Sequence, residues 1–172
     1  MLRLLSICIL ALLAATDCQA ARTVEGVVRG VYDGDTILLV TRESSRLKTR
    51  LYGVDAPETA KPDSSGQPFG EAARRALLSK IIGKKVSAEI VDVDQYQRTV
   101  AVIRYAGRDI NREMVEEGMA WAYRHYLQGP YASEYLDAET RARSRRAGLW
   151  RDVNPRPPWE FRTSLRGGRQ QR

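Results

Sequence analysis

Three acidic residues of this sequence lie in contexts typical of turns, where a carboxylate is free to bind a ligand. Asp35 follows an Asp-Gly pair in a DGDT motif, and Asp55 and Glu58 lie in the segment VDAPET. If the fold brings them together, each pair repels by about 4 kcal/mol at about 4 Å and an effective dielectric constant near ~20, so a cation or protons must compensate the charge. Ordinary hairpin turns also use Asp-Gly pairs, so the motif alone does not establish a metal site.

The other possible ligands indicate which cation to expect. The chain has a single histidine, His125, and both of its cysteines, Cys8 and Cys18, lie in an apolar amino-terminal stretch. A multi-histidine zinc site, a disulfide framework and a cysteine nucleophile are therefore excluded. Ligation by oxygen alone favours calcium, and magnesium less. Because the residue before a proline is extended, the carbonyl of Ala56, which precedes Pro57, is a further candidate ligand.

Two arginines accompany these acids. Arg50 precedes Asp55 by five positions, which on an ideal strand places the two side chains on opposite faces, so the strand must bend if both serve one site. Gly53 is the residue that allows this bend. Arg98 opens a later strand, where a barrel brings it near Arg50. Two arginines beside a metal suit phosphoryl transfer, since charge grows on the phosphate oxygens as water attacks; as isolated residues, each is typical of a solvated surface.

Composition indicates one globular domain with a polyanionic partner. The 172 residues carry a formal net charge of +7, with 43% hydrophobic and 28% charged residues. Most of the basic residues are arginines, whose forked guanidinium suits phosphate, although a soluble basic surface is the plain alternative. Aromatic and basic residues alternate in the segment 121–126, WAYRHY, as in surfaces that stack nucleic-acid bases. Trp121 as a core residue and His125 as a spectator are the alternatives there.

The amino terminus resembles a secretory signal peptide. A positive start, an apolar run over 4–15 and small residues before position 21 predict cleavage after Ala20. The run is shorter than the roughly 20 apolar residues that span a bilayer. A lipid on Cys18 is less favoured, because Asp17 stands where a small residue is needed. We expect a secreted or periplasmic protein with no membrane attachment after cleavage.

The elements that must position these residues are five strands and about three helices. β-Branched residues and turn signals predict three strands, at 23–32, 35–41 and 47–54. Apolar residues at helical spacing then predict a helix at 68–83. A hairpin of strands 86–90 and 100–105 follows, and then helices at 111–117 and 132–147. Five strands with a helix between the third and the fourth predict an α+β, mainly β fold, a closed oligonucleotide-binding (OB-type) barrel. The basic, proline-rich tail is expected to have a mobile end, with Trp159 and Phe161 docking its first half.

Six motifs, in order, resemble the staphylococcal-nuclease-like, or thermonuclease, family over about residues 24–150. They are DGDT (33–36), RLYGVDAPET (50–59), PFGEA (68–72), DQYQR (94–98), EEGMAWAY (116–123) and AGLW (147–150). The resemblance implies an OB-type barrel with three helices and a calcium-dependent phosphodiesterase that acts on DNA and RNA and leaves 3′-phosphate ends. It divides the chain into a signal peptide (1–20), a nuclease-like domain (21–150) and a tail (151–172).

The resemblance also implies roles at the matching positions. Calcium is bound by Asp35, Asp55 and the carbonyl of Ala56; Glu58 positions or deprotonates the attacking water; Arg50 and Arg98 contact the phosphate; and Tyr96, Tyr123 and Tyr126 contact the nucleotide. The sequence departs from the family's well-studied member in two ways. Gln95 and Gln97 stand where that protein has lysine and glycine, so the turn must form without glycine, and the Tyr123–Tyr126 spacing is longer by one residue.

Two functions are compatible with these features. The first is a secreted, monomeric nuclease, and the second is a non-catalytic nucleic-acid-binding OB module. Three clustered acids oppose the binding of a polyanion, so a pure binding module has no use for them. This argument favours the enzyme.

Overall fold

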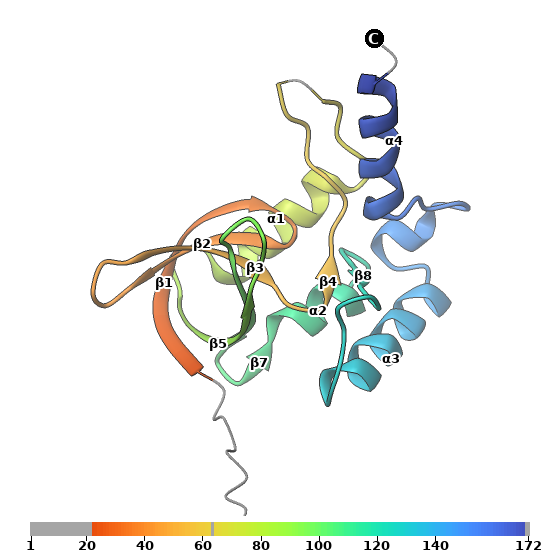
Figure 1. Ribbon diagram of the computed structural model, residues 1–172. Coiled ribbons are helices and arrows are strands. Elements are labelled where there is room, and N and C mark those ends of the chain that lie inside the picture. Colours follow the sequence, from red (N-terminus) through yellow and green to blue (C-terminus); the bar gives the residue numbers. More distant parts are fainter. Residues whose placement is uncertain (1–21, 63, 171–172) are drawn as a thin grey trace, which may run out of the picture.

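Five long strands close into a barrel in the computed structural model, which describes residues 22–62 and 64–170. The strands are β1 (Arg22–Asp33), β2 (Thr36–Thr41), β3 (Arg46–Leu51), β5 (Lys85–Val93) and β6 (Thr99–Tyr105). Their order is β3-β2-β1-β5-β6, and a parallel pairing between β3 and β6 closes the barrel (Figure 1). The predicted OB-type barrel is confirmed. The expected signal peptide lies outside the described residues.

The turn between β1 and β2 positions the first acid. Asp33 pairs with Thr36 at the end of the β1–β2 ladder, and the Asp35 amide donates to Asp33 Oδ1 at 3.2 Å. A Cβ on Gly34 would lie 2.6 Å from the Cβ atoms of both Ala56 and Ala73. Glycine therefore lets this turn pack directly against the loop that follows β4 and against α1.

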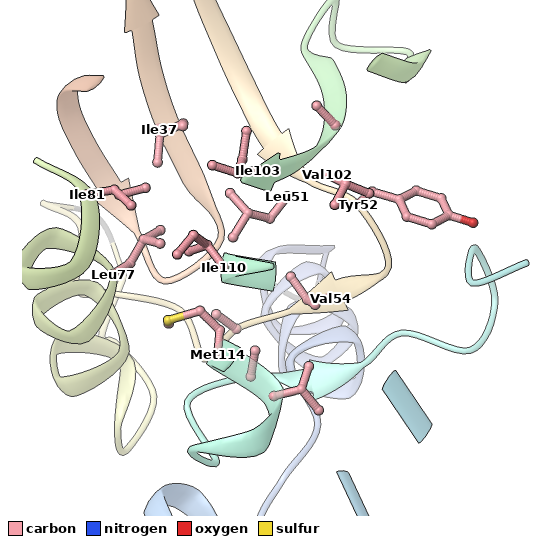
Figure 2. Packing of buried hydrophobic residues seen from close by; sticks show 14 of the residues in the cluster. Ile37, Leu51, Tyr52, Val54, Leu77, Ile81, Val102, Ile103, Ile110 and Met114 are labelled. Carbon is pink, nitrogen blue, oxygen red and sulfur yellow. The ribbon is translucent and has the colours of Figure 1, made fainter. Parts of the chain in front are cut away.

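Three helices form at the predicted places: α1 (Gly70–Ile81) and α2 (Ile110–Glu116) pack on the barrel, and α3 (Tyr131–Ser144) packs against α2 and β8. The apolar face of α1 contributes Ala73, Leu77 and Ile81 to the core, and all three are fully buried. Figure 2 shows Leu77 and Ile81 facing Ile37 of β2 and Met114 of α2. Within the described residues, no helix has the length and apolar character needed to cross a membrane.

A bend after β3 redirects the chain toward the site. Gly53 has a φ of +70°, a conformation that glycine adopts without strain, and it separates β3 from the short strand β4 (Val54–Asp55). β4 pairs with β8 (Trp121–Ala122), while β7 (Arg108–Asp109) extends the sheet beside β6. The bend that the Arg50–Asp55 spacing predicts is therefore present.

The tail differs from the expectation of about three helices. After the 3₁₀ turn η1 (Gly148–Arg151), residues Pro158–Gln170 form a fourth helix, α4, which lies beside the loop after β4 (Figure 1). Pro155 and Pro157 before this helix and the glycine pair within it weigh against helix formation, so the sequence did not predict it. Trp159 packs against Trp121 and Trp150, as the sequence analysis expected of the tail's first half.

Candidate active site

Asp35 lies at the end of the β1–β2 turn, and its carboxylate accepts three hydrogen bonds. The Ala56 amide donates to Oδ2 at 3.0 Å, and the Thr36 hydroxyl donates to Oδ1 at 2.9 Å. Arg50 Nη1 donates to Oδ1 at 3.0 Å. Burial opposes ionisation, but the Arg50 charge and the hydrogen bonds hold the pKa of Asp35 below its usual value. Burial and the negative charge of Asp35 raise the pKa of neighbouring Asp33 to about 7.

Arg50 joins Asp35 to Asp55. Its Nη2 donates to Asp55 Oδ1 at 2.7 Å and to the Val54 carbonyl at 3.3 Å. The Asp55 side chain is 0% exposed and that of Arg50 is 16% exposed, so the ion pair is largely removed from solvent. Because Gly53 bends the chain between the two residues, side chains five positions apart reach one site. A buried carboxylate of this kind requires a positively charged partner.

Glu58 follows in the loop after β4, where its backbone is fixed. Its amide donates to Gln67 Oε1 at 3.0 Å, and its carbonyl accepts from the Gln67 amide at 2.8 Å. A Cβ on Gly70 would lie 2.1 Å from the Glu58 carbonyl oxygen, so glycine at the start of α1 permits this close approach. The carboxylate itself receives a hydrogen bond from Lys61 Nζ at 3.0 Å. Glu58 is thus held by its backbone while its side chain stays partly accessible.

Arg162 was not predicted as a site residue, although it contacts two of the predicted acids. From α4, its Nη1 and Nη2 donate to Asp55 Oδ1 and Oδ2 at 3.0 and 2.8 Å, and Nη1 also donates to Glu58 Oε1 at 3.0 Å. Nothing in the sequence distinguishes this arginine from the other arginines of the tail. Pro158, at the first position of α4, is the one local signal that points to a helix there.

The backbone of Arg98 lies close to the site, but its side chain forms an ion pair with Asp94, outside the site. In the parallel β3–β6 ladder Arg50 pairs with Val100, which places Arg98 just before the same stretch of β6. Its guanidinium contacts Asp94 Oδ2 at 2.7 Å and lies 5.5 Å from the centroid of the Tyr96 ring. Among the described residues, Arg98 forms an ion pair with Asp94, and it forms none with the three acids of the site. Gln97 makes the hairpin turn with a φ of +58°, without glycine, as predicted.

The predicted nucleotide-binding tyrosines divide into an adjacent pair and a separate residue. The rings of Tyr123 and Tyr126 meet edge to face with centroids 5.1 Å apart, and Tyr126 is exposed. Tyr96 is exposed at the β5–β6 turn. Tyr123 is covered on one face by Trp159, whose ring is nearly parallel at 11° and 5.3 Å from it. Trp121 is buried, so it is the core residue that the sequence analysis held as the alternative.

The donor chemistry of this site fits a hard cation. Asp35, Asp55 and Glu58 offer only carboxylate oxygens, and the first two are buried, where their charge requires compensation. In the described part of the chain, however, no three acidic, histidine or cysteine side chains are arranged as a ready coordination shell. Arginine nitrogens occupy these oxygens instead. Calcium would therefore bind Asp55 only if Arg162 moved away.

A closed OB-type barrel that gathers acids and arginines beside surface tyrosines defines the class of nuclease-like barrels. Residues 48–152 match the family described as staphylococcal nuclease homologue, and the chain belongs to this family. It is 41% identical over 147 residues to a micrococcal nuclease of Shigella flexneri, covering 80% of this chain and 79% of that protein. It is 37% identical over 145 residues to an uncharacterized endonuclease of Haemophilus influenzae, covering 84% of this chain and 76% of that protein.

Proposed function

We propose that the protein is a calcium-dependent endonuclease that hydrolyses DNA and RNA and leaves 3′-phosphate ends. Membership of the staphylococcal nuclease family, with relatives named as nucleases, supports hydrolytic nuclease activity. The observation that carries the assignment of the site is the ion-pair network in which Arg50 joins Asp35 to Asp55 and Arg162 joins Asp55 to Glu58. The apolar amino terminus supports a secreted or periplasmic protein, and we propose that it acts as a monomer.

In this proposal Glu58 positions or deprotonates the attacking water. Its backbone is anchored by Gln67 while its carboxylate keeps 16% exposure, so the group is fixed and still reachable by solvent. Water attacks phosphorus and the bond from phosphorus to O5′ breaks, so that one product ends in a 3′-phosphate and the other in a 5′-hydroxyl. The proton from water passes to the Glu58 carboxylate, and the O5′ oxygen gains a proton from solvent.

In this proposal, Arg50 and Arg98 bind the phosphate group of the substrate. Arg50 and Arg98 present planar forks that match two phosphate oxygens, and the charge on those oxygens grows in the transition state. Arg50 faces the acids directly, whereas Arg98 must exchange its pairing with Asp94 for the substrate. Calcium, when bound through Asp35, Asp55 and the Ala56 carbonyl, would supply positive charge that polarises the phosphate.

The substrate bases are proposed to lie against tyrosine rings. Tyr123 and Tyr126 present two rings next to each other, and Tyr96 presents a third at the tip of the β5–β6 hairpin. Stacking on aromatic rings contributes about 1 to 3 kcal/mol per base and tolerates any base. This surface therefore suits both DNA and RNA.

A non-catalytic nucleic-acid-binding module stays the second candidate, because one observation favours it. Asp55 and Glu58 are paired with Arg162, and Asp35 is paired with Arg50, so the acids do not present free negative charge to a polyanion. The repulsion that counts against a binding module is therefore reduced in this conformation.

One digestion assay separates the two functions. Purified protein is incubated with single-stranded DNA, and in parallel with RNA, in calcium or in excess chelator. We expect degradation with calcium and none with chelator, and end-labelling of the products then tests for 3′-phosphates. Intact DNA and RNA in both conditions, together with retained binding in a mobility-shift assay, would favour the binding module.

A further inference from the structure

Helix α4 is attached to the candidate active site at three points. Gln67 Nε2, from the loop that anchors Glu58, donates to the Arg156 carbonyl at 3.1 Å just before the helix. Trp159 packs against the cluster that contains Trp121 and Trp150. Arg162 forms ion pairs with Asp55 and Glu58. The connection from Asp152 to Pro157 is mostly exposed, so the helix is linked to the barrel by a segment with few packing contacts. Release of the helix from the site would therefore have to break these three contacts.

Arg162 occupies the positions where a cation would bind. Its two terminal nitrogens meet both oxygens of the Asp55 carboxylate, and one of them also meets Glu58. A forked, charge-assisted contact of this kind is among the stronger polar interactions in proteins. Asp55 Oδ1 accepts from both Arg50 and Arg162 and Oδ2 accepts from Arg162, so a cation that approaches this buried carboxylate meets the positive charge of the Arg162 guanidinium. Arg162 and a cation compete for the same carboxylate.

Trp159 occupies the ring face where a base would stack. Its indole lies nearly parallel to Tyr123, at an interplanar angle of 11° and a centroid distance of 5.3 Å. This is the offset stacked arrangement that aromatic rings prefer. One turn of one helix thus places an indole on the predicted nucleotide-binding ring and a guanidinium on the predicted metal ligands.

We propose that α4 is an intramolecular occupant of the active site, which calcium and nucleic acid must displace before substrate can bind. This inference rests on the proposed function. Trp159 takes the place of a base and Arg162 the place of the cation. Since displacement consumes part of the binding energy, both ligands bind the wild-type protein more weakly than they bind a variant whose helix is released.

Calcium binding tests the contact made by Arg162. Isothermal titration of calcium alone, without substrate, compares the wild-type protein with Arg162→Ala and with Arg166→Ala. Arg166 lies one turn further along α4 and is exposed, so its replacement removes the same charge from the same helix without touching the acids. We expect calcium affinity to rise about tenfold in Arg162→Ala, whereas the control stays within about twofold of wild type. Equal or weaker calcium binding by Arg162→Ala would overturn the proposal.

Oligonucleotide binding tests the contact made by Trp159. Fluorescence anisotropy with a labelled single-stranded octanucleotide, in chelator so that no cleavage occurs, compares wild type with Trp159→Ala and Phe161→Ala. Phe161 is an aromatic residue of the same helix that lies beneath Arg156 and not on Tyr123. We expect Trp159→Ala to bind about tenfold more tightly, because a base takes the freed ring face, and Phe161→Ala to bind as wild type does. Weaker binding by Trp159→Ala would mean that the indole helps to hold substrate, and would contradict the proposal.

These assays separate failure of the inference from failure of the proposed function. If the protein digests DNA with calcium but Arg162→Ala gains no calcium affinity, α4 does not compete and the nuclease function stands. If neither protein binds calcium, the calcium requirement is wrong, and the octanucleotide assay alone decides the inference. A thermal melt of each variant shows that the barrel is intact.

Discussion

Arg50 Nη2 lies 2.7 Å from Asp55 Oδ1, across the bend that Gly53 makes between β3 and β4. The same guanidinium reaches Asp35, so one arginine compensates two buried carboxylates contributed by separate segments of the chain. The pairing explains how these acids remain close together in the described conformation. It also means that the site depends on the geometry of the bend as much as on its polar residues.

Replacement of Glu58 tests the proposed mechanism. Glu58→Ala removes the group assigned to the attacking water, and a positioned acid or base contributes about 10² to 10⁴ in rate. We expect turnover on single-stranded DNA with calcium to fall by about that factor while the circular dichroism spectrum is retained. Glu71→Ala removes an exposed acid of α1 that pairs with Arg74, and is the matched control. Near-normal turnover in Glu58→Ala would remove this residue from the mechanism.

The substitution Arg98→Lys tests whether the phosphate contact requires the two hydrogen bonds of a guanidinium group. In the structure Arg98 contacts Asp94 through both Nε and Nη2, and a lysine point charge cannot reproduce two such bonds. We expect Arg98→Lys to lower kcat at least tenfold in the digestion assay, since one of two phosphate hydrogen bonds is lost, worth about 1.5 to 3 kcal/mol. Arg74→Lys alters an exposed pair with Glu71 and should leave kcat unchanged. An Arg98→Lys enzyme with wild-type kcat would contradict the bidentate role.

Features that follow from local spacing were predictable from the sequence. The β1–β2 turn follows from an Asp-Gly pair between β-branched runs, and the bend at Gly53 follows from the spacing of Arg50 and Asp55. Each depends on residues a few positions apart, where turn chemistry and side-chain alternation are informative. The barrel then follows from the order of the strands and the first helix.

The contacts that were missed join residues far apart in the chain. Arg162 meets Asp55 across 107 positions, and no local pattern selects it from the other arginines of the tail. Two prolines precede α4 and a glycine pair lies within it, so the sequence did not predict this helix, which is held by contacts such as the packing of Trp159. Arg98 shows the converse: proximity to Arg50 was expected, but a partner four positions away, Asp94, holds its side chain.

Asn111 is predicted to stabilise the closure of the barrel, because it links β6 to the chain just after β3. Its side chain is fully buried, accepts from the Ile103 amide at 3.0 Å and donates to the carbonyls of Tyr52 and Ala101, each at 3.0 Å. Asn111→Leu leaves the Ile103 amide and the Tyr52 carbonyl to find other partners, whereas the Ala101 carbonyl keeps its bond from the Tyr52 amide. Because each unsatisfied buried group costs about 1 to 3 kcal/mol, we expect the free energy of unfolding, measured by urea titration, to fall by at least ~2 kcal/mol.

Asn154→Leu is the matched control for this change. Asn154 lies exposed in the segment before α4, so the same substitution there should change the unfolding free energy by less than about 0.5 kcal/mol. Equal midpoints for the two variants would show that the Asn111 hydrogen bonds contribute little, and would refute the prediction.

Alanine substitutions at Gly53 and Gly83 distinguish the cost of backbone strain from the cost of side-chain crowding at the bend. Gly53 and Gly83 both have a φ of +70°, but a Cβ on Gly53 would lie 2.5 Å from Leu127 Cδ1 and 3.3 Å from the Tyr135 ring, whereas a Cβ on Gly83 would meet nothing within 4 Å. Alanine at either position carries the backbone penalty of about 1 kcal/mol, and only Gly53→Ala adds overpacking of about 1 to 3 kcal/mol. We therefore expect the urea midpoint to fall further for Gly53→Ala.

The same pair should also differ in catalysis. If the crowding at Gly53 is relieved by a shift of the bend between Arg50 and Asp55, and not by rotation of the Leu127 side chain, kcat for DNA should fall in Gly53→Ala even at temperatures where that variant is fully folded. Gly83 lies between α1 and β5, away from the acids, and its variant should keep the wild-type kcat. If both variants lose the same stability and neither loses activity, the bend tolerates a side chain and the geometry of the Arg50–Asp55 pair does not depend on glycine.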